Sequence, residues 1–423
     1  MVLQNGIHEE KELGITGYSV KWVLEKLEEC CDDYVKARDD RKVVDIEAVD
    51  VSEGKGYLSR VFVTTITFDD GDNYKIAMKV PTYSIIEDKV KEMGGFENHN
   101  HEEGRANINL AHDIECDAIS FVSTFPNFPS PKVYFTQKTR EGQDCGLPGR
   151  DAPGVIIMKA IDGASLGIIR SVTTEQCLNF AIDFATLQDY VAQSPESKWK
   201  GKFDSYLHFD KGMFDACKIG MNRLKDEFPE ELAEISNLFE SLDWEKFSKH
   251  ALKTIPEQLN ATTYAHGDAW TNNVMFKKNP DGSVGNEALA YIDYQIGFEG
   301  SPLFDIARFL TLCADAEVRR EITTPTLKTY YKKLTELYGK RGENVPFSFD
   351  EAEEMYDLAY VQQTYELVII AAFMEKDATV APEVTEARSA KLKLRTRFAM
   401  LDALQVWKKR NYSKLFAQFK LLA

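Results

Sequence analysis

Apolar residues recur at helical spacing near the start of the chain. Val20, Val23, Leu24 and Leu27 are separated by charged and polar residues, and Tyr34 continues the same stripe. This spacing is typical of an amphipathic helix with one face buried, so the pattern predicts a helix over residues 20–36. We expect this helix to belong to the scaffold of the protein and not to its functional site.

The spacing of the apolar positions changes over residues 43–80, where short runs rich in β-branched and aromatic residues follow one another. Residues 60–68 (RVFVTTITF) and 74–80 (YKIAMKV) have this composition, and residues 69–73 between them are polar and include a glycine. Two such runs joined by a polar turn predict a β-hairpin.

A helical pattern returns at residues 106–122, and residues 154–158 (GVIIM) predict one more strand. Beyond that strand the pattern is mostly helical, except for a short β-rich stretch over residues 262–293 that contains the turn sequence NPDG. The order of elements predicts an α+β fold with two lobes. We expect a nucleotide-binding lobe over residues 1–158 and a helical C-terminal lobe over residues 159–423.

The composition and net charge of the chain limit the kinds of molecule that it is expected to bind. The chain has 423 residues, of which 43% are hydrophobic, so it can bury a large core without help from metals or disulfides. Its formal net charge is -17. A field of this sign repels polyanions, so we expect neither a nucleic-acid partner nor a membrane partner.

The cysteines and the N-terminal residues indicate the cellular compartment. Seven cysteines are scattered without a CxxC spacing, which predicts free thiols in a reducing environment. The first residues lack the basic segment and apolar core of a signal peptide, and no apolar run approaches the ~20 residues of a membrane span. We therefore expect a cytoplasmic protein.

Candidate chemistry is concentrated in residues 264–274 (YAHGDAWTNNV) and 291–305 (YIDYQIGFEGSPLFD). Transfer of a phosphoryl group requires a side chain that orients the acceptor hydroxyl and oxygen ligands for the magnesium ion on the phosphates. Asp268 suits the first role, and Asn273 and Asp293 suit the second. These residues are also common turn formers, but both segments follow apolar strands in the expected order. We expect His266 to be a satisfied histidine packed under the loop.

The N-terminal part contains a second group of candidates. Gly54, Gly56 and Ser59 lie in GKGYLSR, directly before the first strand of the hairpin, and glycines there would let the backbone approach a phosphate closely. In the second strand, Lys79 alternates away from Met78 and its apolar neighbours. Kinases hold the nucleotide phosphates with a lysine on such a strand.

That lysine needs an acidic partner. Glu115 interrupts the apolar stripe of the helix predicted at residues 106–122, and a buried carboxylate is unfavourable unless it is paired. We therefore expect a Lys79–Glu115 ion pair, with Glu102 or Glu103 as alternatives.

The pair HGDAWTNN and IDYQ resembles the HGDxWxxN and DxQ motifs of the aminoglycoside/choline kinase-like superfamily, and most closely those of the ecdysteroid kinase-like and CHK kinase-like proteins of invertebrates. The resemblance implies a bilobal protein-kinase-like fold, with an antiparallel N-lobe and a mostly helical C-lobe. It also implies that Asp268 is the catalytic aspartate and that Asn273 and Asp293 bind the metal. Asp305 resembles the aspartate that braces the catalytic loop from the start of a helix.

The same resemblance implies ATP and Mg²⁺ as cofactors and places a hinge that contacts adenine at Lys159 to Ile161. Two positions depart from the family pattern. Lys159 stands where relatives often have an acidic residue, and Gln188 stands where many have a histidine. These departures concern the nucleotide contacts and local packing, not the metal and acceptor positions.

The sequence thus predicts a small-molecule kinase that transfers the γ-phosphate of ATP to a hydroxyl. A steroid alcohol, a sugar or glycoside and an amino alcohol all remain open as acceptors, because fold-level analogy does not define a pocket. A catalytically weak binding protein with the same fold is the alternative function. A protein kinase is disfavoured because HGD replaces the HRD-type loop and DYQ replaces the DFG-type loop. The oligomeric state is open.

Overall fold

The hairpin predicted from the sequence forms the centre of a five-stranded antiparallel sheet. In the computed structural model, which describes residues 9–52, 58–82, 101–140, 143–203, 207–373 and 380–414, the hairpin consists of β2 (Ser59–Phe68) and β3 (Asn73–Pro81). The strand order is β1-β2-β3-β5-β4, with β1 at Val43–Asp50, β4 at Val133–Gln137 and β5 at Val155–Lys159. The sequence did not predict β4, whose residues are all half-buried and therefore do not alternate.

Two helices precede the sheet where one was predicted. They are α1 (Val20–Cys30) and α2 (Asp32–Arg38), and the break falls at Cys31, whose Sγ accepts the backbone N–H of Tyr34 over 3.3 Å. The prediction of one continuous helix is therefore wrong, because a thiol that caps the second helix leaves no trace in the apolar spacing.

The sheet is covered differently on its two faces. Val23 and Leu27 of α1 belong to one buried core with Phe62 and Met78 of the sheet. Because side chains alternate along a strand, Lys79 lies on the opposite face, where α4 (His101–Val122) packs against β3 and β4. This alternation brings a helix that carries a buried acid next to the lysine of β3.

The chain divides into two compact units. The first comprises residues 1–126 and 130–162, and the second comprises residues 127–129 and 163–423. The fold is α+β, with an antiparallel sheet in the N-terminal region and a helical C-terminal region, as predicted.

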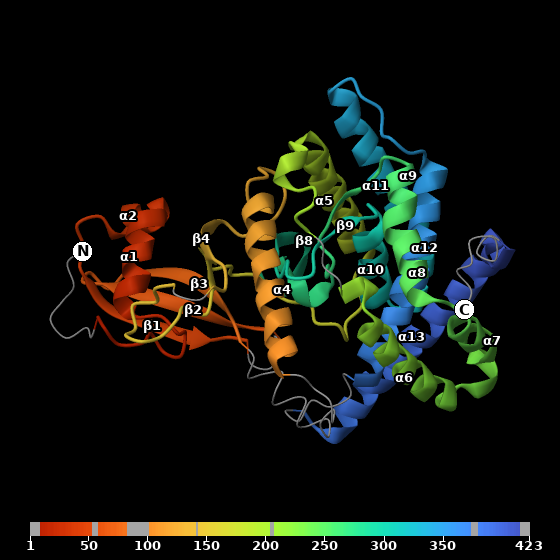
Figure 1. Cartoon of the computed structure of the whole chain (residues 1–423), viewed down its shortest axis with the longest axis horizontal. Coiled ribbons are helices and arrows are strands. Elements are labelled where there is room, and N and C mark those ends of the chain that lie inside the picture. The colour runs from red at the N-terminus through yellow and green to blue at the C-terminus, as the bar shows by residue number, and fades with distance from the viewer. Residues whose placement is uncertain are drawn as a thin grey trace. The chain divides into compact units, whose positions relative to one another are not determined.

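In the second unit, helices surround two small two-stranded antiparallel sheets (Figure 1). The strands are β6 (Thr263–Ala265), which pairs with β9 (Phe298–Gly300), and β7 (Val274–Lys278), which pairs with β8 (Val284–Tyr291). The α-helices are α5 (Thr174–Gln193), α6 (Lys211–Glu227), α7 (Pro229–Glu240), α8 (Trp244–Lys249), α9 (Ile255–Gln258), α10 (Phe304–Cys313), α11 (Ala316–Lys340), α12 (Phe349–Phe373) and α13 (Pro382–Arg410). Short 3₁₀ helices lie at η1 (Glu196–Lys198), η2 (Leu207–Phe209) and η4 (Thr271–Asn273), and η3 (His250–Thr254) is a short π-helix.

Helix α10 forms the middle of this unit. Every one of its residues is buried, and it packs against α12, which in turn packs against α13. Such a helix is hydrophobic almost all round, and the two charged side chains that it contains, Asp305 and Arg308, therefore require partners.

The structure also bears on the predictions for the cysteines and for membrane-spanning helices. All seven cysteines are free thiols, as predicted, and all except Cys30 are buried. Over the described ranges, no helix is both long enough and apolar enough to span a bilayer.

Candidate active site

The segment 264–274 forms a tight loop between two strands. It leaves β6 at Ala265, turns through Gly267 and Asp268, and enters β7 through η4, where the N–H of Asn273 donates to the carbonyl of Trp270 over 2.9 Å. The two small sheets therefore fix both ends of the loop.

Gly267 and Asp305 determine the path of this loop. The backbone N–H groups of His266 and Gly267 donate to the two carboxylate oxygens of Asp305, over 2.8 and 3.0 Å. Gly267 has a φ of +81°, and a Cβ at this position would lie 2.1 Å from the carbonyl oxygen of Ile296. Only glycine fits here, and Asp305 is the brace that the sequence predicted.

We expect Gly267→Ala to destabilise the protein by more than the ~1–3 kcal/mol that a left-handed backbone alone costs, because the backbone at Ile296 must also move. Gly282→Ala is a matched control. Gly282 has a φ of +82°, but nothing lies within 4 Å of its added Cβ. Urea denaturation should give a clearly larger loss for Gly267→Ala, and equal losses for the two variants would contradict this account of the loop.

His266 connects this loop to the second one. Its ring is fully buried; Nε2–H donates to the carbonyl of Ile292 over 3.2 Å, and Nδ1 accepts the N–H of Asp268 over 3.3 Å. Both contacts suit a neutral ring, and burial lowers the pKa of His266 to about 4. The prediction of a satisfied histidine is therefore confirmed.

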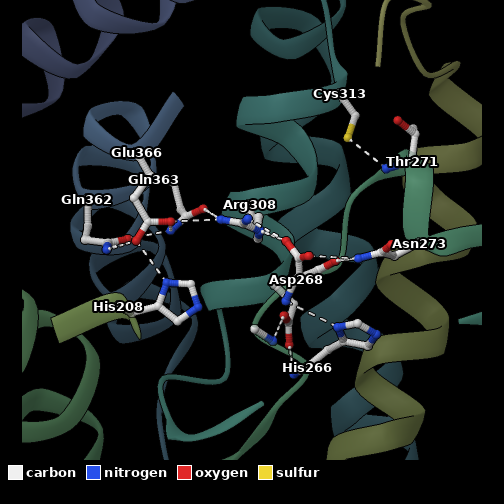
Figure 2. A network of polar contacts seen from close by, with 12 residues as sticks. His208, His266, Asp268, Thr271, Asn273, Arg308, Cys313, Gln362, Gln363 and Glu366 are labelled. Atoms are coloured by element: carbon white, nitrogen blue, oxygen red, sulfur yellow. Dashed lines mark hydrogen bonds and ion pairs between the residues drawn. The ribbon is translucent and has the colours of Figure 1, made fainter. Parts of the chain in front are cut away.

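Asp268 accepts hydrogen bonds on both carboxylate oxygens (Figure 2). The amide Nδ2 of Asn273 donates to Oδ2 over 2.9 Å and to the backbone carbonyl of Asp268 over 3.0 Å. The guanidinium of Arg308 donates to Oδ1 from Nε over 3.1 Å and from Nη2 over 2.5 Å. The Asp268 side chain is only 15% exposed, so its orientation is strongly restrained.

The surroundings of Asp268 act on the pKa of its carboxyl in opposite directions. Burial raises the pKa of its carboxyl above the ordinary value, the cation of Arg308 acts to lower it, and the nearby carboxylate of Asp293 acts to raise it. An oxygen that is basic and fixed in direction is what an acceptor hydroxyl needs.

Asp293 lies directly beyond β8 in an unusual backbone conformation. Its φ is +70°, in the left-handed region that few residues other than glycine adopt. The preceding residue, Ile292, donates its N–H to the carbonyl of Asn273 over 3.0 Å, which continues the β7–β8 ladder and joins the segments of Asn273 and Asp293. Strained residues are often found at functional sites, so this conformation supports a role for Asp293.

The donor atoms here fit magnesium. Because Asn273 donates both of its amide contacts to Asp268, its amide oxygen is the atom that can bind a cation. Across the described residues, no three His, Cys, Asp or Glu side chains gather into a cluster that could hold a metal. One amide oxygen and one carboxylate would need phosphate oxygens and water as further ligands, and this is how Mg²⁺ is usually bound with nucleotides.

Lys79 and Glu115 form the ion pair that the sequence predicted. The Nζ of Lys79 lies 2.7 Å from both Oε1 and Oε2 of Glu115. The two side chains are 7% and 1% exposed, so this is a buried pair, and Glu102 or Glu103 is not needed to explain it. Removing either partner would take from a buried charge the close counter-ion that compensates it here.

The remaining predicted site residues are spread over the first unit. Ser59 is buried at the start of β2, Lys159 is exposed at the end of β5, and Ile161 is half-buried beyond it. Gly54 and Gly56 lie outside the described residues.

Gln188, which stands where relatives often have a histidine, has a packing role in the second unit. Its side chain bonds to the carbonyl of Pro302 and to the hydroxyl of Tyr330. These contacts hold the segment that precedes α10 and Asp305.

Sequence reasoning missed the group of residues around Arg308. Arg308 also donates from Nη1 to Gln363 Oε1 and Glu366 Oε2, over 2.8 and 2.9 Å, and His208 Nδ1 lies 2.9 Å from Glu366 Oε1. Burial acts to raise the pKa of Glu366, but its contacts with His208 and with the guanidinium of Arg308 lower that pKa to about 2. The available signal was an arginine within an otherwise apolar helix.

A cavity of about 320 Å³ lies elsewhere in the second unit. It is lined by α6, by the segment from the end of α7 into α8, and by Tyr365 of α12. None of the residues predicted for the site lines it.

One known protein family matches almost the whole chain. The family described as "Uncharacterized oxidoreductase dhs-27" (DUF1679) matches residues 20–411. A protein of Caenorhabditis elegans that carries this name, "Uncharacterized oxidoreductase dhs-27", is 22% identical to the chain over 330 residues. The match covers 75% of the chain and 38% of that relative, so the chain spans well under half of its length.

Three solved structures are similar over most of the chain. A choline kinase from Cryptosporidium parvum is 11% identical, with 94% of this chain and 97% of that chain covered and a TM-score of 0.48. An ethanolamine kinase from Plasmodium vivax is 10% identical, with 94% and 99% covered and a TM-score of 0.41. An aminoglycoside phosphotransferase with ADP bound is 14% identical, with 88% and 99% covered and a TM-score of 0.37.

Proposed function

The chain belongs to the DUF1679 family, described as "Uncharacterized oxidoreductase dhs-27", and we propose that it is an ATP-dependent kinase that phosphorylates a hydroxyl group of a small molecule. The observation that carries this proposal is the geometry of Asp268. Its carboxylate is held by Arg308 and by Asn273. The N–H of Ile292 donates to the carbonyl of Asn273 and so joins Asn273 to the segment of Asp293. The carboxylate of Asp293 is close enough to raise the pKa of Asp268. A base beside two oxygen ligands meets the needs of phosphoryl transfer.

In the proposed mechanism, Asp268 accepts a hydrogen bond from the acceptor hydroxyl and directs its oxygen toward the γ-phosphorus. Asn273 and Asp293 would hold Mg²⁺, which when bound neutralises charge on the phosphate oxygens. Within the first unit, Lys79, oriented by Glu115, is the proposed contact for the phosphates. His266 takes no part as a base, since both of its ring nitrogens are engaged in holding the two loops.

An oxidoreductase is the activity named for the relative from Caenorhabditis elegans. Dinucleotide-dependent oxidoreductases commonly bind their cofactor on a parallel sheet, at a glycine-rich turn between a strand and a helix. Every strand pairing among the described residues is antiparallel. We therefore propose that any such activity of the relative belongs to the part of that protein that this chain does not match.

A catalytically weak binding protein with the same fold is the second candidate. The residues that such proteins lose are present here, namely Lys79, Asp268, Asn273 and Asp293. We therefore favour an active enzyme. The narrower likeness to ecdysteroid kinase-like proteins, and a steroid alcohol, glycoside or amino alcohol as acceptor, remain hypotheses within this proposal.

The proposal is tested by measuring ATP consumption with a fractionated metabolite extract and, in parallel, with protein substrates. We expect consumption with one or a few metabolite fractions only. Oxidation of NADH or NADPH by the same preparations is measured alongside. Consumption with protein substrates alone, or nicotinamide turnover without ATP turnover, would contradict a small-molecule kinase.

We expect Asp293→Ala to weaken binding of Mg²⁺-ATP by at least about tenfold, because it removes a direct metal ligand. Asp268→Asn should bind Mg²⁺-ATP almost as the wild type does, since Asp268 serves the acceptor. Calorimetric titration of both variants separates the two roles. ATP without metal serves as the control, because the variants should then differ little. Equal losses of Mg²⁺-ATP affinity would refute this division of roles.

A further inference from the structure

Arg308 connects the proposed catalytic aspartate to a second buried acid (Figure 2). One edge of its guanidinium donates twice to Asp268 Oδ1, and Nη1 donates to Glu366 Oε2 over 2.9 Å. The side chains of Arg308 and Glu366 are 10% and 6% exposed. A guanidinium in such surroundings is strongly unfavourable without acceptors, so Arg308 is confined to a position between the two carboxylates.

Helix α10 fixes the loop through two of its side chains. Asp305 and Arg308 lie three residues apart, so they project from the same side of the helix. Asp305 accepts the backbone N–H groups of His266 and Gly267 and so holds the backbone of the loop. Arg308 instead contacts the side chain of Asp268. Helix α10 therefore holds both the backbone of the loop, through Asp305, and the proposed catalytic carboxylate, through Arg308.

The far side of Arg308 contacts α12, and η2 in turn contacts α12 at Glu366. Gln363 Oε1 accepts from Nη1 over 2.8 Å, and Gln362 and Gln363 each donate an amide N–H to Glu366. His208 adds a contact of 2.9 Å to Glu366. Both acceptors of Nη1 therefore lie on one helix and make further hydrogen bonds of their own, which leaves Arg308 little freedom to follow movements of Asp268.

The hydrogen bonds of Asp268 identify the oxygen that is available for a substrate. A carboxylate offers about four acceptor positions, two on each oxygen. The two N–H groups of Arg308 take both positions of Oδ1, and the amide of Asn273 takes one position of Oδ2. One position, on Oδ2, is left.

From this arrangement we infer that Arg308 is a positioning residue for Asp268: it closes Oδ1 and directs Oδ2 toward the acceptor hydroxyl. The inference rests on the proposed kinase function. It requires an arginine in particular, because only a planar guanidinium donates to Asp268 through one edge and to Glu366 and Gln363 through Nη1. A lysine supplies the charge without this geometry.

A contribution to stability alone does not explain why an arginine lies between Asp268 and Glu366. Replacing buried ion pairs by apolar side chains of similar volume is often neutral or stabilising, so a fold has no general need for an arginine between two acids. A purely structural arginine is available for comparison. Arg319 of α11 is 2% exposed and bonds to Asp402 of α13 over 2.8 Å, and it contacts none of the residues of the site.

The test combines Arg308→Lys with Asp268→Asn in a double-mutant cycle. We expect Arg308→Lys to lower kcat by up to about 10²-fold while the KM for ATP stays unchanged, since misplacement of a catalytic group by about 1 Å has effects of that size. In the Asp268→Asn background the same change should have no further effect on kcat. Arg319→Lys, the matched control, should lower stability and leave kcat unchanged.

A crystal structure of Arg308→Lys supplies a readout that needs no activity. We expect the Asp268 carboxylate to rotate and to lose its 2.9 Å contact with Asn273. An unmoved carboxylate, or losses of kcat that multiply in the double variant, would overturn the inference. If the wild type transfers no phosphate to any acceptor, the proposed function falls, and the position of Asp268 in the crystal still decides the role of Arg308.

Glu366→Gln replaces Arg308→Lys in both arms if the lysine variant does not fold. It keeps the shape of the side chain but removes the charge that anchors Nη1. A smaller fall in kcat is expected, again absent in the Asp268→Asn background. A fall of the same size in that background would count against a positioning role.

Discussion

Asp268→Asn is expected to lower the turnover number by about 10²–10⁴-fold while the affinity for Mg²⁺-ATP is retained. The amide keeps the shape of the carboxylate but loses the charge that accepts the proton of the incoming hydroxyl. Proton transfer can come late in phosphoryl transfer, so part of the fall will reflect lost orientation and not lost basicity. Either cause reduces turnover and leaves nucleotide binding in place.

The surroundings of Asp268 add a consequence for stability. If the new amide presents its oxygen to Arg308, its NH₂ group faces the NH₂ group of Asn273, so one donor loses its acceptor. A loss of about 1–3 kcal/mol in unfolding free energy is expected from such a buried mismatch. Activity is therefore measured well below the melting temperature of the variant, together with far-UV circular dichroism as a check of folding. Near-normal turnover by the folded variant would be incompatible with the mechanism.

Asp305→Ala is expected to have the largest effect on stability. The substitution leaves the buried N–H groups of His266 and Gly267 without their acceptor, and each such group costs about 1–3 kcal/mol. The catalytic loop should then lose its fixed path, and turnover should fall with it. Guanidinium denaturation of the wild type and the variant measures the first effect, and hydrogen exchange of the two amides measures the second.

Asp305→Asn is the matched control for this prediction. Its side-chain oxygen can still accept one of the two N–H groups, so its unfolding free energy should lie between those of the wild type and Asp305→Ala. The same order is expected for protection of the two amides from exchange. Identical stability of the wild type and Asp305→Ala would mean that the loop does not depend on this brace.

The parts of the site that could be predicted from sequence are those encoded within a short segment. The loop that contains Asp268 and the strand that ends before Asp293 are defined by local apolar runs, turn residues and motif spacing. The Lys79–Glu115 pair was also accessible, although its partners are 36 residues apart. A charged residue inside an apolar stripe must have a partner, and strand alternation indicated which lysine it was.

The network around Arg308 was not accessible in this way. It joins η2, α10 and α12, and the partners of Glu366 lie 58 and 158 residues from it. The same reasoning that identified Glu115 would have marked Arg308, an arginine among the apolar residues of α10, as needing a partner. Its partners, however, are set by how the helices pack. Local spacing does not contain this information.

The irregular parts of the fold were missed for simpler reasons. Strand β4 has no alternation of burial, and β9 has only three residues, so neither produces a recognisable pattern. The break at Cys31 depends on a thiol that accepts one backbone N–H. Each of these features is decided by a few contacts that form only in the folded chain.

The central claim is that this chain transfers the γ-phosphate of ATP to a small-molecule hydroxyl. It is tested most directly by incubating the protein with a metabolite extract and ATP labelled with heavy oxygen in the γ-phosphate, followed by mass spectrometry. We expect labelled phosphate to appear as an ester on one or a few metabolites, and Asp268→Asn to form these products about 10²–10⁴-fold more slowly. Label that remains in ATP, or that appears only in inorganic phosphate, would contradict it.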